Sequence, residues 1–266
     1  MVLMAACIGL SAVAQKKKND KPKEAAPAEQ PATSKPAAGS EATAAGTDSQ
    51  SAESDAMKQQ VGGFFNHFIN KYIVANRFGD YDVARDALYD LLVESPGNDS
   101  LFFTLGYLYY DNQKFTSAAL VGQELLARNS KNPDALELTA SSFESLGLKD
   151  RALQYFESLY LVSNSFPALY KTAFLQYDLK RYKESQASCD VMITKKEADE
   201  LTVTYNTADN KTKDYPIRVA ILNLQGMIAR ESGDKVAAKT YFEQALKAAP
   251  DFLQAKDNLT ALGKVK

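Results

Sequence analysis

Apolar residues recur at helical spacing through most of the chain after residue 58. Between residues 99 and 132, two such runs are separated by the short polar link 111–114. Their marker positions are Phe102, Leu105, Gly106 and Tyr109 in the first run, and Ala118, Leu125 and Leu126 in the second. A short link makes neighbouring helices antiparallel. The pattern therefore predicts a pair of antiparallel helices that cross at the small residues Gly106 and Ala118.

The same pattern recurs with a period of 34 residues. Equivalent positions at this spacing are Ala84, Ala118 and Ala152; Gly79, Gln113 and Gly147; and Pro133 and Pro167. A period of this length indicates stacked supersecondary units, none of which can bury its apolar face alone. We therefore expect a repeat architecture with a continuous core.

This pattern resembles the tetratricopeptide repeat family, and five units can be aligned with it. They run from Phe68 to Pro96, from Asp99 to Asn132, from Leu136 to Pro167, from Leu169 to Met192, and from Leu222 to Pro250. Ser185 follows Ala152 by 33 residues, so the fourth unit lacks one residue, which we place at the turn near Lys180 and Arg181.

The resemblance implies an all-α fold, a right-handed α-solenoid of about five helix pairs. After the fifth unit, Ala255, Leu259 and Leu262 predict a final helix that caps the exposed face of the last pair. Asp251 is suited to the start of that helix.

One insertion interrupts the repeat. The spacing from Ser185 to Ala238 exceeds one period by 19 residues. Within it, Leu201–Tyr205 alternates apolar and polar residues and is followed by a polar turn, which predicts a short β-hairpin near residues 200–215. Pro216 fits the first turn of the next helix. Two interpretations of the insertion stay open, a contact for a partner and a tolerated surface excursion.

The first residues predict export of the chain. Residues 1–14, MVLMAACIGLSAVA, are apolar and end in a small-x-small pattern, which is typical of a secretory signal peptide. About 20 apolar residues are needed to cross a membrane, so this run is too short for a transmembrane helix. We expect secretion across the inner membrane of a bacterium, to a periplasmic or outer-membrane-associated location. Lipidation of Cys7 is the alternative to cleavage after Ala14.

Residues 15–57 form a low-complexity linker rich in Lys, Ala, Pro, Glu and Ser, without aromatic residues. Such a composition cannot offset the entropy of ordering and predicts disorder. The linker is either a spacer that holds the repeat domain, residues 58–266, away from a membrane or wall, or a tail without a specific role.

Composition narrows the chemistry that we expect. A net charge of −2 argues against nucleic-acid binding, which needs a clustered excess of Lys and Arg. Once Cys7 is removed, one cysteine and one histidine, Cys189 and His67, cannot form a zinc site. No phosphate-binding loop or catalytic constellation is present. We expect no enzymatic activity, cofactor or metal, and we expect Cys189 to be a small core residue.

The family resemblance also implies a groove, because the first helix of each tetratricopeptide unit lines the concave side. The residues carried over are Phe103, Tyr107, Tyr110 and Asp111 in the second unit; Glu137, Ser141 and Glu144 in the third; and Tyr170, Phe174, Tyr177 and Asp178 in the fourth. They predict two aromatic ridges that flank a small acidic strip. Carboxylate-clamp members of the family have Lys, Arg and Asn at such positions, so we do not expect that function here.

These residues suggest a groove for a peptide with apolar and basic side chains, since aromatic residues are efficient binding anchors. The alternative for each aromatic residue is packing between units. We therefore expect a scaffold or adaptor of the bacterial envelope that binds a protein or peptide; the partner and the oligomeric state stay open. The alternative function is glycan binding on the Tyr and Phe platforms.

Overall fold

The computed structural model describes residues 48–207, 209 and 211–264. The predicted signal peptide, with Cys7, and the linker up to residue 47 lie outside the described residues. The chain divides into two compact units. The described part of the smaller unit ends at His67, and the described part of the larger unit begins at Phe68 and contains the repeats.

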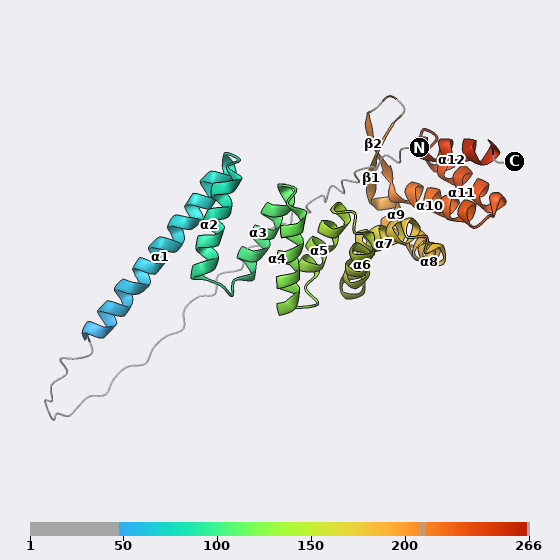
Figure 1. Cartoon of the computed structure of the whole chain (residues 1–266). Helices are drawn as coiled ribbons and strands as arrows, with labels where there is room; N and C mark the ends of the chain where they lie inside the picture. Colours follow the sequence, from blue (N-terminus) through green and yellow to red (C-terminus); the bar gives the residue numbers. More distant parts are fainter. Residues whose placement is uncertain (1–47, 208, 210, 265–266) are drawn as a thin grey trace, which may run out of the picture. The chain divides into compact units, whose positions relative to one another are not determined.

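Within the described residues there are twelve helices and two strands (Figure 1). They are α1 (Asp48–Arg77), α2 (Tyr81–Glu94), α3 (Asp99–Asp111), α4 (Phe115–Arg128), α5 (Pro133–Ser145), α6 (Lys149–Ser163), α7 (Phe166–Asp178), α8 (Tyr182–Ile193), α9 (Glu197–Glu200), β1 (Thr202–Asn206), β2 (Thr212–Pro216), α10 (Ile217–Glu231), α11 (Lys235–Ala248) and α12 (Leu253–Lys264). Helix α1 begins inside the segment that composition assigns to the linker, and the domain boundary at residue 58 stays a prediction.

The helices pack in sequential pairs. Helix α3 packs on α4, α5 on α6, α7 on α8 and α10 on α11, while α4 contacts α5, α6 contacts α7 and α8 contacts α10 across successive pairs. In the first pair, Lys71 of α1 forms ion pairs with Asp86 and Asp90 of α2. Helix α12 packs against α11 and α10 as the predicted cap. The all-α solenoid expected from the 34-residue period is confirmed.

Three successive first helices begin at equivalent capping residues. The side chain of Asn98 accepts hydrogen bonds from backbone N–H groups in the first turn of α3, Asn132 does so for α5, and Ser165 caps α7. Asn98 and Asn132 are 34 residues apart, whereas Ser165 follows Asn132 by 33. The missing residue therefore lies before Ser165, between α6 and α7. Our placement near Lys180 was wrong.

The turn inside each pair contains one residue with a left-handed backbone. These residues occupy the same repeat position and have φ values of 73° at Gly79, 59° at Gln113, 74° at Gly147, 60° at Lys180 and 86° at Gly233. Glycine adopts this conformation without steric cost, whereas a side chain crowds the backbone. The turn geometry explains why this position recurs in the sequence pattern.

Small residues let neighbouring helices approach closely. A methyl group added to Gly106 would lie 2.5 Å from Leu138 of α5 and 3.2 Å from Val121 of α4. The predicted small residue thus serves the contact within its own pair and the contact to the next one. The equivalent small residues of the second helices are all fully buried: Ala84, Ala118, Ala152, Ser185 and Ala238.

The predicted hairpin is present between the fourth and fifth pairs. Strands β1 and β2 are antiparallel, and Val203 lies opposite Tyr215 in the register. Both side chains are buried, and the ring of Tyr215 lies 5.0 Å from that of Phe252 in an edge-on arrangement. The sequence did not predict the short helix α9. Pro216 ends β2 and precedes α10, so it does not lie within the first turn of that helix.

One ion pair joins β2 to the segment between α11 and α12, and another joins α9 to α10. The Asp251 carboxylate accepts hydrogen bonds from Lys213 at 2.5 Å and from Tyr215 at 3.3 Å. Asp199 of α9 pairs with Arg218 of α10. Lys213 and Arg218 lower the pKa values of Asp251 and Asp199, respectively, through these hydrogen bonds. Asp251, which we expected at the start of α12, therefore serves as an anchor for β2.

The turn geometry makes the first prediction. Replacing Gly147 by Ala should lower the free energy of unfolding by about 1 kcal/mol, because alanine is strained at a φ of 74°. Gly97→Ala is the matched control, since Gly97 has no positive φ and open space around it. Urea denaturation followed by circular dichroism measures both variants. Equal unfolding midpoints for the two variants would contradict the role of the turn.

Candidate functional site

Helix α3 presents aromatic side chains on one side of a cavity. Tyr107 is exposed, and Phe103 and Tyr110 are half-buried. The ring of Tyr110 packs edge-on against Phe115, with 5.3 Å between the ring centroids. Asp111 at the end of α3 is exposed. Tyr107 and Tyr110 line the cavity, whereas Phe103 and Asp111 do not.

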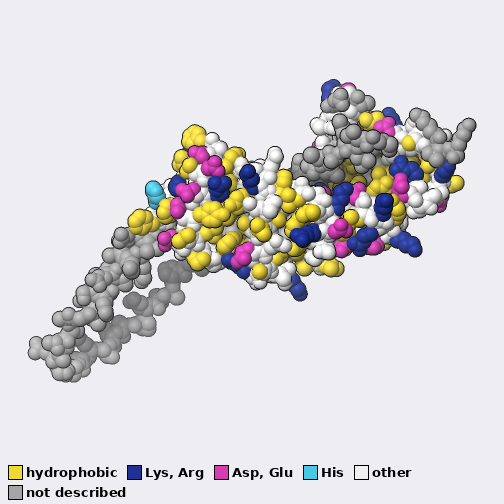
Figure 2. Space-filling view, in the orientation of Figure 1, with side chains coloured by type: hydrophobic (Ala, Val, Ile, Leu, Met, Phe, Trp, Pro, Cys, Tyr) yellow, Lys and Arg dark blue, Asp and Glu magenta, His cyan; other side chains and the backbone are white. Residues whose placement is uncertain are grey.

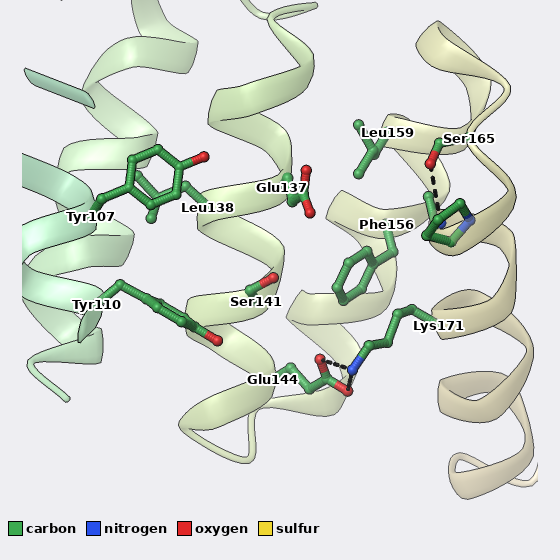
Figure 3. A pocket seen from close by; sticks show the side chains of 12 residues that line it. Tyr107, Tyr110, Glu137, Leu138, Ser141, Glu144, Phe156, Leu159, Ser165 and Lys171 are labelled. Carbon is green, nitrogen blue, oxygen red and sulfur yellow. Dashed lines mark hydrogen bonds and ion pairs between the residues drawn. The ribbon is translucent and has the colours of Figure 1, made fainter. Parts of the chain in front are cut away.

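Helix α5 supplies the polar strip in the middle. Glu137, Ser141 and Glu144 are spaced by four and three residues, which places them on one face of the helix. All three line the cavity (Figure 3). The structure therefore brings the predicted acidic strip and the tyrosines of α3 together.

The predicted second aromatic ridge on α7 does not line the cavity. Tyr170 is fully buried, and its hydroxyl lies 3.4 Å from the hydroxyl of Tyr205 on β1. Phe174, whose ring centroid lies 4.8 Å from that of Tyr170, packs against the same core. Counted from the helix caps, Tyr170 is equivalent to Phe103 and Glu137. It is buried because the hairpin covers this face of α7, so Tyr170 is not a groove residue.

The last two predicted residues of α7 also lie apart from the cavity. Tyr177 is half-buried, and its ring centroid lies 5.6 Å from that of Tyr182. Asp178 forms an ion pair with Lys149 at 2.6 Å. Neither residue lines the cavity.

On α7, Lys171 lines the cavity where the sequence predicted aromatic residues. Its ammonium group lies 3.0 Å and 3.1 Å from the two carboxylate oxygens of Glu144, and the pair is largely shielded from solvent. The dashed lines between Lys171 and Glu144 in Figure 3 mark this bridge from α7 to α5. Lys171 was not among the groove residues predicted from the sequence. The signal that could have found it is its position one residue after the predicted groove residue Tyr170.

These elements enclose a cavity of about 390 Å³ between α3, α5, α6 and α7. Its floor is apolar, because Leu138, Phe156 and Leu159 are buried side chains that line it. The full lining is Tyr107, Tyr110, Glu137, Leu138, Ser141, Glu144, Phe156, Leu159, Ser165, Pro167, Ala168 and Lys171. A concave, mainly apolar surface with a few polar groups is the usual form of a ligand site.

The electrostatics of the cavity are asymmetric. Glu144 is neutralised by Lys171, whereas Glu137 makes no ion pair within the described part of the chain. Glu137 is an exposed residue, but partial burial of its carboxyl group, and after it the negative charge of Asp134, raises the pKa of Glu137 above its usual value. Burial also raises the pKa of Tyr107, and the carboxylates of Glu137, Asp134 and Asp111 add to this effect. The tyrosine end of the cavity is therefore negatively charged.

Other chemistry has little support among the described residues. Cys189 is buried, and burial raises the pKa of its thiol. No group of three or more His, Cys, Asp or Glu side chains is arranged to hold a metal ion in the part of the chain that the structure describes. No described helix is both long and apolar enough to cross a membrane. On the face drawn in Figure 2, basic and acidic side chains are interspersed.

Family models match two parts of the chain. A model described as anaphase-promoting complex, cyclosome, subunit 3, matches residues 111–189, and a tetratricopeptide repeat model matches residues 219–252. The second match covers nearly all of the fifth helix pair. The chain contains tetratricopeptide repeats. This fold typically serves as a protein-interaction scaffold and not as an enzyme. No curated protein matches the sequence.

Solved structures of tetratricopeptide repeat proteins share the fold of this chain. One from Parabacteroides merdae has a TM-score of 0.60 at 19% identity and covers 75% of this chain and 72% of that one. The MamA protein has a TM-score of 0.56 at 16% identity, with coverage of 70% and 92%. YrrB, described as a tetratricopeptide repeat protein with an unusual peptide-binding site, has a TM-score of 0.57 at 12% identity, with coverage of 71% and 89%. At these identities the likeness concerns the fold alone.

The raised pKa of Glu137 makes a prediction about stability. Because its pKa is higher in the folded than in the unfolded chain, the ionised carboxylate destabilises the fold at neutral pH. Glu137→Gln should therefore unfold at a higher urea concentration than the wild type at pH 7. The difference should shrink as the pH falls toward about 4, where the wild-type carboxyl group gains its proton.

Glu94→Gln, at an exposed position near the end of α2, controls for the loss of one negative charge. The measurement is the urea midpoint of the three proteins between pH 7 and pH 4. A Glu137→Gln variant that is less stable than the wild type at pH 7 would contradict the prediction.

Proposed function

We propose that the protein is a non-catalytic scaffold or adaptor of the bacterial cell envelope, and that it binds a peptide or protein segment in the cavity between α3, α5 and α7. The observation that carries the proposal is the cavity itself. An exposed tyrosine and an unpaired carboxylate lie at the rim of an apolar floor. A partner that covers this surface would remove apolar area from water, which is the main driving force of association.

The side chains of α3 suit a peptide ligand. Tyr107 offers a broad apolar ring with a polar tip at the opening of the cavity, a combination that often dominates the affinity of an interface. Tyr110, packed against Phe115, is held in place beside it. Rigid aromatic anchors lose little side-chain entropy on binding, so they favour recognition of a short segment.

The hairpin limits where such a segment can lie. Because β1 covers Tyr170, the inner face of α7 is closed to a ligand at that point. A segment in the cavity would therefore lie over α3 and α5 and would meet α7 at Lys171. Because the hairpin closes part of α7, we expect the peptide segment bound in the cavity to be short.

The location in the envelope rests on the sequence. An apolar run over residues 1–14 and the low-complexity segment after it fit a secreted protein whose repeat domain is held at a distance from a membrane or wall. Such a linker suits an adaptor, since a flexible segment lets the domain reach a partner at a distance.

Glycan binding has no observation in its favour over peptide binding. It needs aromatic platforms on both sides of the acidic strip. On α7, Tyr170 is buried and Phe174 packs against the core beneath the hairpin.

Site-specific photo-crosslinking tests the peptide groove. With a benzoylphenylalanine at position 107, irradiation of cells should yield protein adducts, because this ring lies at the cavity rim. The matched control carries the same group at position 81, where a tyrosine is 47% exposed, compared with 43% for Tyr107, but lies outside the cavity. Identical adducts from both positions, or adducts only with glycans, would contradict the proposal.

Intact-mass analysis of the mature protein tests its export. The expected product begins at Gln15, which corresponds to cleavage after Ala14, and is recovered in the envelope or periplasmic fraction. A mass that corresponds to a diacylglyceryl group on Cys7 would support export but favour the lipid-anchored alternative. An unprocessed chain in the cytoplasmic fraction would contradict an envelope location.

A further inference from the structure

We infer that the cavity selects a peptide segment in which an apolar side chain lies close to an arginine or a lysine. The apolar side chain enters the cavity above Phe156 and Leu159, and the basic group lies against the ring of Tyr107 beside Glu137. This inference rests on the proposed function and adds the chemical class of the ligand.

The floor of the cavity suits an apolar side chain. Leu138 and Phe156 are 2% and 3% exposed, and Leu159 is 5% exposed, yet all three line the cavity. They present apolar surface at the bottom of an opening that a single side chain can enter. An apolar side chain gains most from this position, since it leaves water and meets close-packed neighbours.

The charges that line the cavity favour a basic group in the ligand. Its only basic side chain among the described residues is Lys171, and both carboxylate oxygens of Glu144 already engage it. Glu137 is the second carboxylate, and no ion pair within the described chain includes it. Asp134, one turn earlier on α5, and Asp111 of α3 are also without an ion pair there. The uncompensated charge at this end of the cavity is therefore negative.

Tyr107 provides an aromatic ring in the same cavity as Glu137. The ring of Tyr107 and the carboxylate of Glu137 line the same cavity from adjacent first helices, α3 and α5. In Figure 3, Glu137 lies between the tyrosines on one side and Phe156 and Leu159 on the other. A guanidinium or ammonium group can contact an aromatic face and a carboxylate together, and both contacts favour it. Burial is the main cause of the raised pKa of Tyr107, and the carboxylates of Glu137, Asp134 and Asp111 add to it.

Other ligand classes fit this surface less well. An acidic segment or a peptide C-terminus would meet Glu137 as a like charge, and it would find Lys171 already paired with Glu144. A wholly apolar segment would cover Glu137 without supplying a partner, which leaves a buried charge unpaired. Only a segment with both an apolar and a basic side chain can cover the apolar floor and also supply a cation to Glu137.

Selection from a random peptide display library on the full chain tests this inference. We expect the enriched peptides to share an apolar residue within four positions of an arginine or lysine. Fluorescence anisotropy then gives the affinity of one such peptide. Glu137→Gln should weaken it about tenfold, the loss typical of one partly desolvated charged hydrogen bond. Replacing the basic residue of the peptide by glutamine should cause a similar loss, and the two losses should not add.

Matched variants separate this result from a loss of folding or of general charge. Glu94→Gln removes a negative charge outside the cavity and should leave the affinity unchanged. Glu137→Lys should reject the basic peptide and recover affinity for a peptide with glutamate in place of its basic residue. Circular dichroism of each variant checks that the helical fold is retained.

The outcomes distinguish this inference from the proposed function. Enriched peptides without a basic residue, whose binding is lost in Tyr107→Ala but kept in Glu137→Gln, would overturn the inference and leave the peptide groove standing. A library without any enriched peptide whose binding depends on Tyr107 would overturn both. A tenfold effect of Glu94→Gln would show that only the overall charge matters, and would also overturn the inference.

Discussion

Every helix pair of this protein has an apolar side that only the next pair can cover, and the rest of the structure depends on this constraint. The contact of Gly106 with Leu138 joins the second pair to the third, and Gly106 also lies close to Val121 within its own pair. At the C-terminal end, α12 supplies the missing neighbour, with Ala255 buried against the last pair. Because the sides of each pair are used for stacking, the polar side chains that remain free for binding come from the exposed face of the first helices.

The hairpin buries part of the exposed face of the first helices, so that this part belongs to the core and not to a binding surface. Val203 and Tyr215 are buried, and Phe252 beside α12 packs edge-on against the rings of Tyr205 and Tyr215. The insertion thus extends the core from α7 across α10 to the C-terminal helix. Its consequence for binding is that Tyr170, at a position equivalent to groove residues in the earlier units, becomes a core residue. An insertion of this kind changes the length of a solenoid groove without a change in the repeat pattern on either side.

The period and its small residues were sufficient to predict the helix pairs, the helical spacing after the fifth unit predicted the cap, and the alternation in the insertion predicted the hairpin, because all three depend on local spacing and turn chemistry. Two features were beyond that reasoning. Counting along a helix places Tyr170 on a face but does not show what covers the face, since the hairpin that covers it is a long-range contact. The spacing between Ala152 and Ser185 shows that one residue is missing but not where, and the hydrogen bond of the Ser165 cap decides this. Lys171 was not predicted because its contact with Glu144 is also a long-range contact, which forms only where α7 approaches α5.

The two glutamates of the cavity show why its charge is informative. Glu137 and Glu144 lie two turns apart on the same face of α5, but their surroundings differ. Glu144 has a partner from the next pair, Lys171, whereas burial raises the pKa of Glu137 without a cation to offset it. Stability alone would favour a neutral residue at position 137, because an unpaired, partly desolvated carboxylate weakens the folded state at neutral pH. A destabilising group held at the edge of an apolar cavity is the pattern expected where the missing cation comes from a partner.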